Sequence, residues 1–385
     1  MSIDFGRPAL RLSDRSSTGE PNELAEARAA AGPVADLTDS NPTRHGLTDP
    51  AIAEVLARHL SEALRYEPDP KGWLPAREAL AARFGGRPDE YWLTASTSEA
   101  YSWLLLALGD PGDMVAAPAP GYPLIDPLAK LASMSTAPYW AYYAHPSGWE
   151  LDLDSVAAAV SGARALVVVN PNNPTGAYVR GSDAAAMSAL CARAGVPIIA
   201  DEVFRPYAIE ASEPAPGMAE SAGDAVVITL DGLSKLLAAP QLKLGWMRLS
   251  GASPIVQPLA GRLDSIADAY LSVNSPVACA LPELLGLADA TVARVRQRCQ
   301  TNLATLRRLG DAVRVRRVEG GWVALIDLPP VMDDAQLGLR LLGSGLSAHP
   351  GWFYDIADAH VLAVSLLPRP EVFAGLLSRV DWLSL

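Results

Sequence analysis

The chain has 385 residues, half of them apolar, so it can bury the core of one large domain or of two domains. Its formal net charge of −12 argues against nucleic acids and anionic membranes as partners. Three widely spaced cysteines, no apolar signal segment at the start and no apolar run long enough to cross a bilayer together predict a cytoplasmic protein.

Short apolar runs alternate with helical patterns from about residue 90 to residue 250. These runs predict strands at residues 91–96, 113–119, 165–170, 196–201, 225–230 and 245–250. Helical patterns lie between them, for example at residues 98–108 and 181–194. This alternation is typical of an α/β protein with a mostly parallel sheet and helices on both faces.

The C-terminal part of the chain follows a different pattern. A long helical stretch near residues 289–309 comes first, and two strand-like runs follow it, at residues 313–318 and 321–328. A helix near 333–343, a strand at 361–367 and a final helix complete the chain. This order predicts an α+β arrangement and therefore a second domain.

Hydroxyl side chains lie at the end of the first predicted strand. Ligands of an open parallel sheet collect beyond the carboxyl ends of its strands. Ser96, Thr97 and Ser98 stand where that strand ends and a helix begins. Hydroxyls and the free N–H groups of a helix start together predict an anion site, although in isolation an ordinary helix cap is the commoner explanation.

The later strand ends carry an amide-rich loop, an acid and a lysine. The loop at residues 171–176 reads PNNPTG, and the next strand ends with Asp201 and Glu202. Lys235 follows the strand after that. The 31 Lys and Arg residues include four lysines, and Lys235 and Lys243 share one largely apolar stretch. Unlike arginine, a lysine in an apolar pocket can lose its proton and attack a carbonyl.

These four parts match the needs of pyridoxal 5′-phosphate (PLP). An anion site suits its phosphate, an amide its phenolic oxygen, a carboxylate its ring nitrogen and a lysine its aldehyde. Nearly from end to end, the chain resembles the class I/II aminotransferases of PLP fold type I. The segments that carry the resemblance are YEPDPKGWLPAR, TASTSEA, PAPGYP, NPNNPTG, ADEVF, LSKLLAAPQLKLGW, NSPV, GGW and HPGWF.

The resemblance implies a domain organisation and an assembly. A large α/β domain over residues 46–270 would hold the cofactor on a mostly parallel sheet between helices. A smaller α+β domain would combine residues 1–45 with residues 271–385. The family also implies a homodimer, because its active sites lie at the subunit interface.

The resemblance assigns roles to individual residues. It implies that Lys235 forms the internal aldimine and that Asp201 pairs with the pyridinium nitrogen. Asn173 would donate to the phenolic oxygen, and Tyr122 would stack on the ring. The residues implied to hold the phosphate are Ser96, Thr97, Ser98, Lys243 and, reaching the neighbouring subunit, Tyr66.

Four positions depart from the family pattern. Lys243 replaces a phosphate-binding arginine, and Gly232 stands where a hydroxyl residue is common. Phe204 replaces a tyrosine that commonly donates to the phenolic oxygen, which should raise the pKa of the aldimine. The largest departure is Ala363, because the family usually has an arginine here that binds the substrate α-carboxylate.

Two explanations of Ala363 stay open. Another cation binds the carboxylate, the candidates being Arg369, Arg44 and, more weakly, His45, or the substrate presents no carboxylate at the usual place. The sequence therefore predicts atypical carboxylate recognition, with slow or no turnover of aspartate, alanine and aromatic amino acids. Aromatic residues in segments that resemble the small-domain wall of the pocket, each of which could also be core, are Trp322, Trp352, Phe353 and Tyr354.

Transamination between an amino donor and a keto acceptor is the activity that the resemblance implies. Lys235, once displaced, would move the proton while Asp201 keeps the ring nitrogen protonated. The same parts serve PLP-dependent lyases, racemases, oxidases and cyclases of secondary metabolism, so these stay alternatives, as does a non-catalytic PLP-binding protein. No metal is expected, because the five histidines have no spacing that suits metal ligands.

Overall fold

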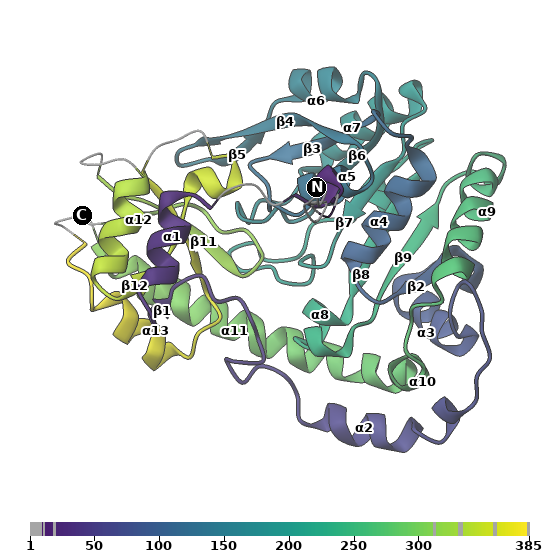
Figure 1. Ribbon diagram of the computed structural model, residues 1–385, viewed down its shortest axis with the longest axis horizontal. Coiled ribbons are helices and arrows are strands. Elements are labelled where there is room, and N and C mark those ends of the chain that lie inside the picture. Colours follow the sequence, from purple (N-terminus) through teal and green to yellow (C-terminus); the bar gives the residue numbers. More distant parts are fainter. Residues whose placement is uncertain are drawn as a thin grey trace, which may run out of the picture.

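A large sheet lies at the centre of the computed structural model, which describes residues 10, 12–17, 21–310, 313–329, 334–356 and 360–382. Within this described part the sheet has eight strands, in the order β2-β9-β8-β7-β6-β3-β4-β5 (Figure 1). Their bounds are β2 Tyr91–Thr94, β3 Met114–Ala119, β4 Ser135–Ala144, β5 Gly148–Leu151, β6 Ala163–Val169, β7 Ile198–Asp201, β8 Val227–Gly232 and β9 Gly245–Ser250.

The mostly parallel sheet is confirmed. Strands β4, β3, β6, β7 and β8 are parallel to one another, whereas β9 is antiparallel to β2 and β8, and β5 to β4. Each strand predicted between residues 90 and 250 is present, with ends shifted by at most two residues. The hairpin of β4 and β5 was not predicted, because β4 is half-exposed along most of its length and has no continuous apolar run.

Helices cover both faces of this sheet. Those on one face are α4 (Thr97–Leu108), α5 (Ile125–Leu131) and α9 (Ser253–Tyr270), and those on the other are α6 (Leu153–Val160) and α7 (Gly181–Ala194). Successive strand residues point to opposite faces, so Val227 packs with α6 and α7 while Ile228 packs with α4 and α9. A further cluster beside β2 and β9 is formed by α2 (Ala51–His59), α3 (Leu74–Phe84) and α10 (Ser275–Leu284).

A smaller antiparallel sheet lies in the C-terminal part, in the order β10-β11-β14-β13. Its strands are β10 Arg314–Val315, β11 Val323–Asp327, β13 His349–Pro350 and β14 Val361–Ser365. One face packs on α11 (Ala288–Arg307), α12 (Asp334–Gly343) and α13 (Pro370–Leu377). The strand predicted at residues 313–318 is thus reduced to two residues.

The N-terminal segment joins this C-terminal part. Strand β1 (Ala35–Asp36) pairs in parallel with β12 (Leu346–Ser347), and α1 (Glu23–Ala30) lies against α12 (Figure 1). This pairing brings together a segment near each end of the chain. The division into two domains and its boundaries stay a prediction, since α10 packs with α2 and α3. Residues 1–9, on which part of the expected lack of a signal segment rests, lie outside the described residues.

A continuous helical run, Ser275–Arg307, connects the cluster beside β2 and β9 with the core on one face of the small sheet. Contrary to the expectation from the sequence, this run is, among the described residues, the one helix long and apolar enough to cross a membrane by length and composition. In the structure, 50% of its most apolar window is buried inside the protein. Its first part belongs to the cluster of α2 and α3, and its last part to the core of the small sheet.

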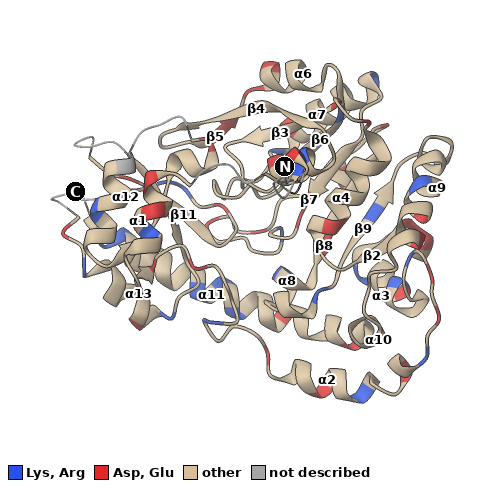
Figure 2. Cartoon of the chain, in the orientation of Figure 1, with Lys and Arg blue, Asp and Glu red and all other residues tan. Residues whose placement is uncertain are grey.

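Charged side chains of both signs are interspersed along the outer helices and loops (Figure 2). The strands of the large sheet carry few charges, and two of these are buried acids at strand ends. Asp201 ends β7 and Asp231 lies next to the last residue of β8. Burying a carboxyl group is unfavourable without a partner, so these positions mark the part of the sheet where chemistry is expected.

Candidate active site

Lys235 lies in the single-turn helix α8 (Leu233–Leu236), directly after β8. Its amine is 5.4 Å from the ring centre of Phe204 and 5.5 Å from that of Trp322. The two rings meet edge to face, with centres 5.3 Å apart. Burial in these apolar surroundings lowers the pKa of the Lys235 amine, while the nearby Asp201 acts in the opposite direction. Such an amine is a better nucleophile than a solvated one.

Asp201 is buried one strand away from the lysine. The Tyr101 hydroxyl donates to its Oδ2 over 3.2 Å, and the Val203 N–H donates to its Oδ1 over 3.3 Å. Burial raises the pKa of the Asp201 carboxyl, and the two donors and the Lys235 amine lower it. Within the described ranges Asp201 forms no ion pair, so this carboxylate can take a cation such as a protonated ring nitrogen.

The start of α4 offers an anion site. Ser96 caps the helix, since its Oγ accepts from the Glu99 N–H over 3.2 Å, which is the ordinary role foreseen for a serine here. The hydroxyls of Thr97 and Ser98 form no hydrogen bond with any residue that the structure describes. Two hydroxyls and the first N–H groups of the helix therefore remain for an anion.

Two glycines bring this helix start close to the lysine. A Cβ atom on Gly245 would lie 3.2 Å from the Thr97 nitrogen. Gly245 pairs with Gly232 across β8 and β9, and a Cβ atom on Gly232 would lie 3.0 Å from the Gly245 Cα. Gly232 stands three residues before Lys235, so the departure at Gly232 has a structural reason: a side chain here would press on the backbone of β9 and require it to shift.

The PNNPTG loop brings Asn173 to the same place. Asn173 lines a small pocket together with Phe204 and Trp322, the two rings around the lysine. The neighbouring Asn172 anchors the loop, because its Nδ2 donates to the Pro120 carbonyl over 3.1 Å. The side-chain amide of Asn173 has no hydrogen-bond partner in the described part of the chain, so it is free to donate to a cofactor oxygen.

Three predicted cofactor residues lie at the surface. Tyr122 is 49% exposed, and the N–H of the preceding Gly121 donates to the Tyr354 carbonyl over 3.0 Å. Lys243 is exposed, and the Asn274 side chain donates to its carbonyl over 3.4 Å. Tyr66 is 77% exposed, and the pocket that it lines contains none of the other predicted cofactor residues. The pocket that Tyr66 lines is therefore separate from the one that Asn173 lines within this chain.

Ala363 is buried on one face of the small sheet. It lies between Leu325 of β11 and His349 of β13, which are its direct partners across the strands. It packs in a cluster with Tyr354, against which Trp149 of β5 also packs. The place of the usual arginine is therefore apolar and aromatic, with one histidine beside it.

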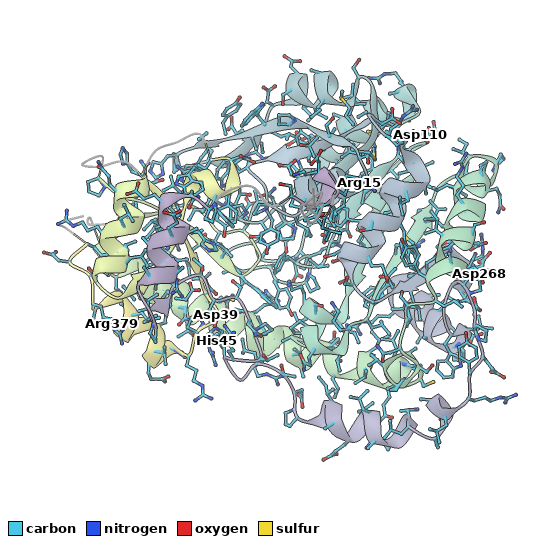
Figure 3. The ribbon with its side chains drawn as sticks, in the orientation of Figure 1. Arg15, Asp39, His45, Asp110, Asp268 and Arg379 are labelled. Carbon is cyan, nitrogen blue, oxygen red and sulfur yellow. The ribbon has the colours of Figure 1, made fainter. Side chains whose placement is uncertain are left out.

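Of the three cations considered as substitutes, two lie beside Asp39 and the third is exposed. Arg369 is exposed, and its guanidinium lies 3.4 Å from the position of a Cβ atom on Gly46. Arg44 forms an ion pair with Asp39 at 3.4 Å, and the His45 ring lies 2.9 Å from the Asp39 carbonyl (Figure 3). In the described residues, none of the three forms a hydrogen bond or ion pair with the Ala363 cluster.

Two residues of this site, Tyr101 and His349, were not predicted from the sequence. Tyr101 lies one helical turn after Thr97, and that spacing was the available signal that its hydroxyl faces the same strand end. The sequence around His349 did not predict its role. Its hydrogen-bond partners Thr38 and Tyr354 come close to it only through strand pairing and a turn.

A buried lysine amine, a buried carboxylate and free donors at a helix start thus lie at one end of an α/β sheet, and this fold is that of PLP fold type I aminotransferases. Residues 34–344 match the family model of aminotransferase class I and II, and the chain belongs to this family.

Known proteins similar to this chain agree with the family. The alanine aminotransferase of Mycobacterium tuberculosis is 28% identical over 273 residues, which are 68% of this chain and 62% of that protein. The glutamate-pyruvate aminotransferase of Escherichia coli is 29% identical over 261 residues, 66% of this chain and 64% of that protein. The matches thus span less than two thirds of the length of these relatives.

Solved structures show the same fold. The alanine aminotransferase from Pyrococcus furiosus superposes with a TM-score of 0.85 at 22% identity, and the match covers 96% of this chain and 98% of that chain. The N-succinyldiaminopimelate aminotransferase from Mycobacterium tuberculosis superposes with a TM-score of 0.79 at 25% identity, over 92% of this chain and 95% of that chain.

Class I/II aminotransferases in general depend on PLP, and the residues present fit this cofactor. Asp201 is a buried acid that can pair with the ring nitrogen, and Lys235 is a buried amine that can take the aldehyde. Gly245 leaves room at the start of α4 that a side chain would fill, which suits the phosphate.

Proposed function

We propose that this chain is a PLP-dependent aminotransferase in which the Lys235 amine binds the cofactor aldehyde covalently. The observation that carries the proposal is the position of this amine, buried between Phe204 and Trp322 at the same sheet end as Asp201. PLP, when bound, supplies an electron sink for the negative charge that develops on the substrate carbon. The partners are an amino acid or amine donor and a keto acceptor.

Each residue has a defined task in this reaction. Asp201, held by Tyr101, keeps a proton on the ring nitrogen through its negative charge. The displaced Lys235 amine would take a proton from the substrate carbon and pass it to the cofactor carbon that carried the aldehyde. Its lowered pKa favours the neutral form that a base requires. The rings of Phe204 and Trp322 exclude water from the amine.

Borohydride reduction tests this assignment directly. The purified protein should be yellow, and reduction should bleach it and fix the cofactor on one lysine. Peptide mapping is expected to place the label on Lys235. A label on Lys243 would contradict the assignment of roles, and no label at all would contradict the proposed function.

The proposal includes a cytoplasmic location. Cys191, Cys279 and Cys299 are buried and form no disulfide, as expected for a reducing compartment.

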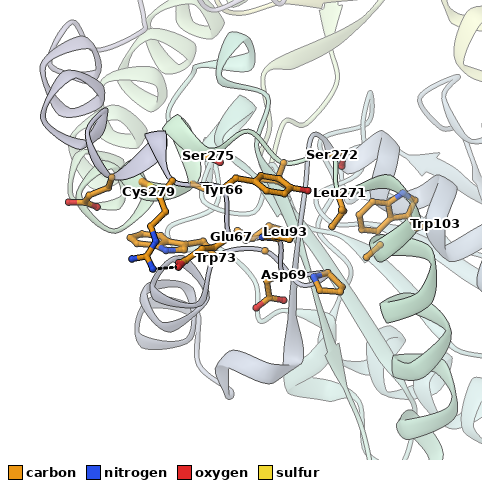
Figure 4. Close-up of a pocket in the computed structure, with 18 residues that line it drawn as sticks. Tyr66, Glu67, Asp69, Trp73, Leu93, Trp103, Leu271, Ser272, Ser275 and Cys279 are labelled. Carbon is orange, nitrogen blue, oxygen red and sulfur yellow. Dashed lines mark ion pairs between the residues drawn. The ribbon is translucent and has the colours of Figure 1, made fainter.

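The proposal also includes a homodimer. A pocket of about 280 Å³ lies beside Tyr66 and is lined by Trp103, Leu271 and Ser272, among others (Figure 4). Leu64 and Tyr66, which are 88% and 77% exposed, leave apolar surface at this place. A second copy of the chain would cover this surface and would bring Tyr66 towards the phosphate of the neighbouring site.

The purified chain is therefore expected to sediment as a dimer, and Leu64→Asp is expected to shift it towards monomer. An aspartate at a buried interface position weakens association by on the order of 2 kcal/mol or more. The matched control is Leu106→Asp, which changes a leucine of α4 that is 49% exposed and lines a different pocket. A monomeric parent protein, or equal dissociation of both variants, would rule out this interface.

Gly245→Ala is expected to weaken PLP binding by about tenfold or more, because its methyl group displaces the N–H groups that receive the phosphate. Gly261→Ala is the control, since a Cβ atom there meets nothing within 4 Å. The measurement is a PLP titration of each apoprotein by absorbance. Equal dissociation constants for the two variants would show that Gly245 does not shape the phosphate site.

The last part of the proposal is atypical carboxylate recognition at Ala363. An arginine at this position would contribute charge-assisted hydrogen bonds, each of about 1.5–3 kcal/mol. Its absence is expected to make aspartate, alanine and aromatic amino acids slow donors. The preferred donor is then an amine whose carboxylate is absent, distant or masked.

A further inference from the structure

A histidine stands next to the place of the missing arginine. His349 of β13 is the direct antiparallel partner of Ala363 in β14. Direct partners point to the same face of a sheet, with Cβ atoms about 4.5–5.5 Å apart. His349 therefore lies on the face that also carries Leu325 and Tyr354.

His349 belongs to a chain of hydrogen bonds that runs from Asp36 to Tyr354. Its Nε2 lies 3.4 Å from Thr38 Oγ1, and its Nδ1 lies 3.0 Å from Tyr354 Oη. Thr38 donates to Asp36 Oδ1 twice, from its hydroxyl over 2.6 Å and from its N–H over 2.7 Å. We call these four residues the Asp36 relay.

Asp36, at one end of the Asp36 relay, determines which group donates and which group accepts in each of its hydrogen bonds. A carboxylate only accepts, so the Thr38 hydroxyl gives its single proton to Asp36. The Thr38 oxygen then accepts from the Nε2–H of a neutral His349. The unprotonated Nδ1 in turn accepts the hydroxyl proton of Tyr354. The oxygen of Tyr354 is left with lone pairs, so towards other groups it is an acceptor.

The surroundings keep this arrangement at neutral pH. Burial lowers the pKa of His349 from its ordinary value, while Asp36 acts in the opposite direction. Burial raises the pKa of Tyr354, and the nearby Tyr122 and Asp36 raise it further. Helix α12 also packs against β13, and its Arg340 forms no hydrogen bond or ion pair with the imidazole in the described part of the chain.

We propose that the Asp36 relay makes Tyr354 a hydrogen-bond acceptor for the substrate, so that the enzyme selects donors with a neutral N–H or O–H group in place of the α-carboxylate. Amino amides and amino alcohols are such donors. The inference rests on the proposed function, because the Tyr354 carbonyl accepts over 3.0 Å from the N–H of Gly121, which precedes Tyr122, the residue predicted to stack on the cofactor. A carboxylate here would face the lone pairs of Tyr354 and the apolar surface of Ala363 and Leu325.

Protonation of His349 reverses the polarity of this contact. An imidazolium donates from both nitrogens, so Nδ1–H donates to the Tyr354 oxygen and the tyrosine proton is free to point at the substrate. The site then offers a donor and a nearby positive charge. Affinity for a carboxylate is therefore expected to rise as the pH falls through the pKa of His349 and to be lost as the pH rises through it.

The test compares L-alaninamide with L-alanine in the first half-reaction of the PLP-loaded protein, followed by the absorbance of the cofactor. The amino groups of the two donors have different pKa values, which alone changes the ratio of the two rates. The ratio of the alaninamide rate to the alanine rate is therefore measured for the parent and for Tyr354→Phe at the same pH, and the two ratios are compared. At pH 8 the parent ratio is expected to exceed that of Tyr354→Phe by about tenfold, the effect of roughly one hydrogen bond. This excess should disappear as the pH falls through the pKa of His349, which a nitrogen-15 titration of the ring measures.

Two more variants separate the relay from a general structural effect. His349→Leu should lose the excess at pH 8 together with its pH dependence, because Tyr354 is no longer held in one direction. Tyr142→Phe, which removes the hydroxyl of a tyrosine on β4 that is 54% exposed, should keep both. A parent ratio at pH 8 equal to that of Tyr354→Phe would overturn the inference.

A second readout needs no turnover. Nitrogen-15 spectra of the histidines, with His349 assigned by its loss in His349→Gln, should show a neutral ring protonated at Nε2 at pH 8. A ring protonated at Nδ1, or charged at pH 8, would overturn the inference. A cofactor that reacts with no donor would instead contradict the proposed function, and the spectrum of His349 would still decide the direction of the relay.

Discussion

Replacing Lys235 with alanine is expected to slow the first half-reaction by about a thousandfold or more. The variant loses the base that moves the proton, and positioned acid–base groups contribute roughly 10²–10⁴-fold. It also loses the covalent attachment of the cofactor, so PLP should leave on dialysis. Stopped-flow absorbance with a saturating donor measures the rate, and circular dichroism checks the fold.

The control for this variant is Lys130→Ala. The Lys130 amine donates to the Ser17 carbonyl at the surface over 2.7 Å and is not among the residues of the candidate site. Its loss should therefore leave the rate within about twofold. If Lys235→Ala kept more than a tenth of the parent rate, Lys235 would not be the base. A surviving biological activity of Lys235→Ala would favour a non-catalytic PLP-binding protein.

Asp201→Asn is expected to slow the same half-reaction by roughly 10²–10³-fold, the usual effect of removing one preorganised electrostatic partner. The amide keeps the shape of the side chain but carries no charge, so it no longer favours the protonated ring nitrogen. Tyr101 and the Val203 N–H would still hold the side chain in place. The rate and the absorbance of the bound cofactor should therefore change without a large loss of stability.

Glu202→Gln separates this effect from the loss of any buried acid. Glu202 is the next residue, is buried, and accepts from the Met218 N–H over 2.7 Å. Its pKa is raised by burial, as is that of Asp201. Glu202→Gln should keep most of the rate. Equal losses in both variants would mean that the packing of the strand end, rather than the charge of Asp201, matters for the reaction.

The central sheet was largely predictable from local pattern. Strands buried on both faces, such as β6 and β7, are short continuous apolar runs, and such runs stand out in the sequence. Half-exposed strands lack this signal, and so β4 and β5 were missed. The strand expected at residues 313–318 has two residues in the structure, because pattern does not show where strand pairing ends.

The sequence by itself determined the chemistry that local order can encode: a lysine after one strand, an acid at the end of another, hydroxyls at a helix start and the absence of an arginine at residue 363. These groups meet because parallel strands end at the same edge of the sheet.

Only the tertiary structure showed which residues lie next to these groups and form hydrogen bonds around them. Tyr101 reaches Asp201 through the packing of α4 on the sheet, and His349 comes to Ala363 through strand register. Thr38 joins His349 although 311 residues separate them in the chain. Hydrogen bonds of this kind depend on the register between segments that are distant in the chain. Because the packing of the whole core sets that register, a local sequence pattern cannot predict these hydrogen bonds.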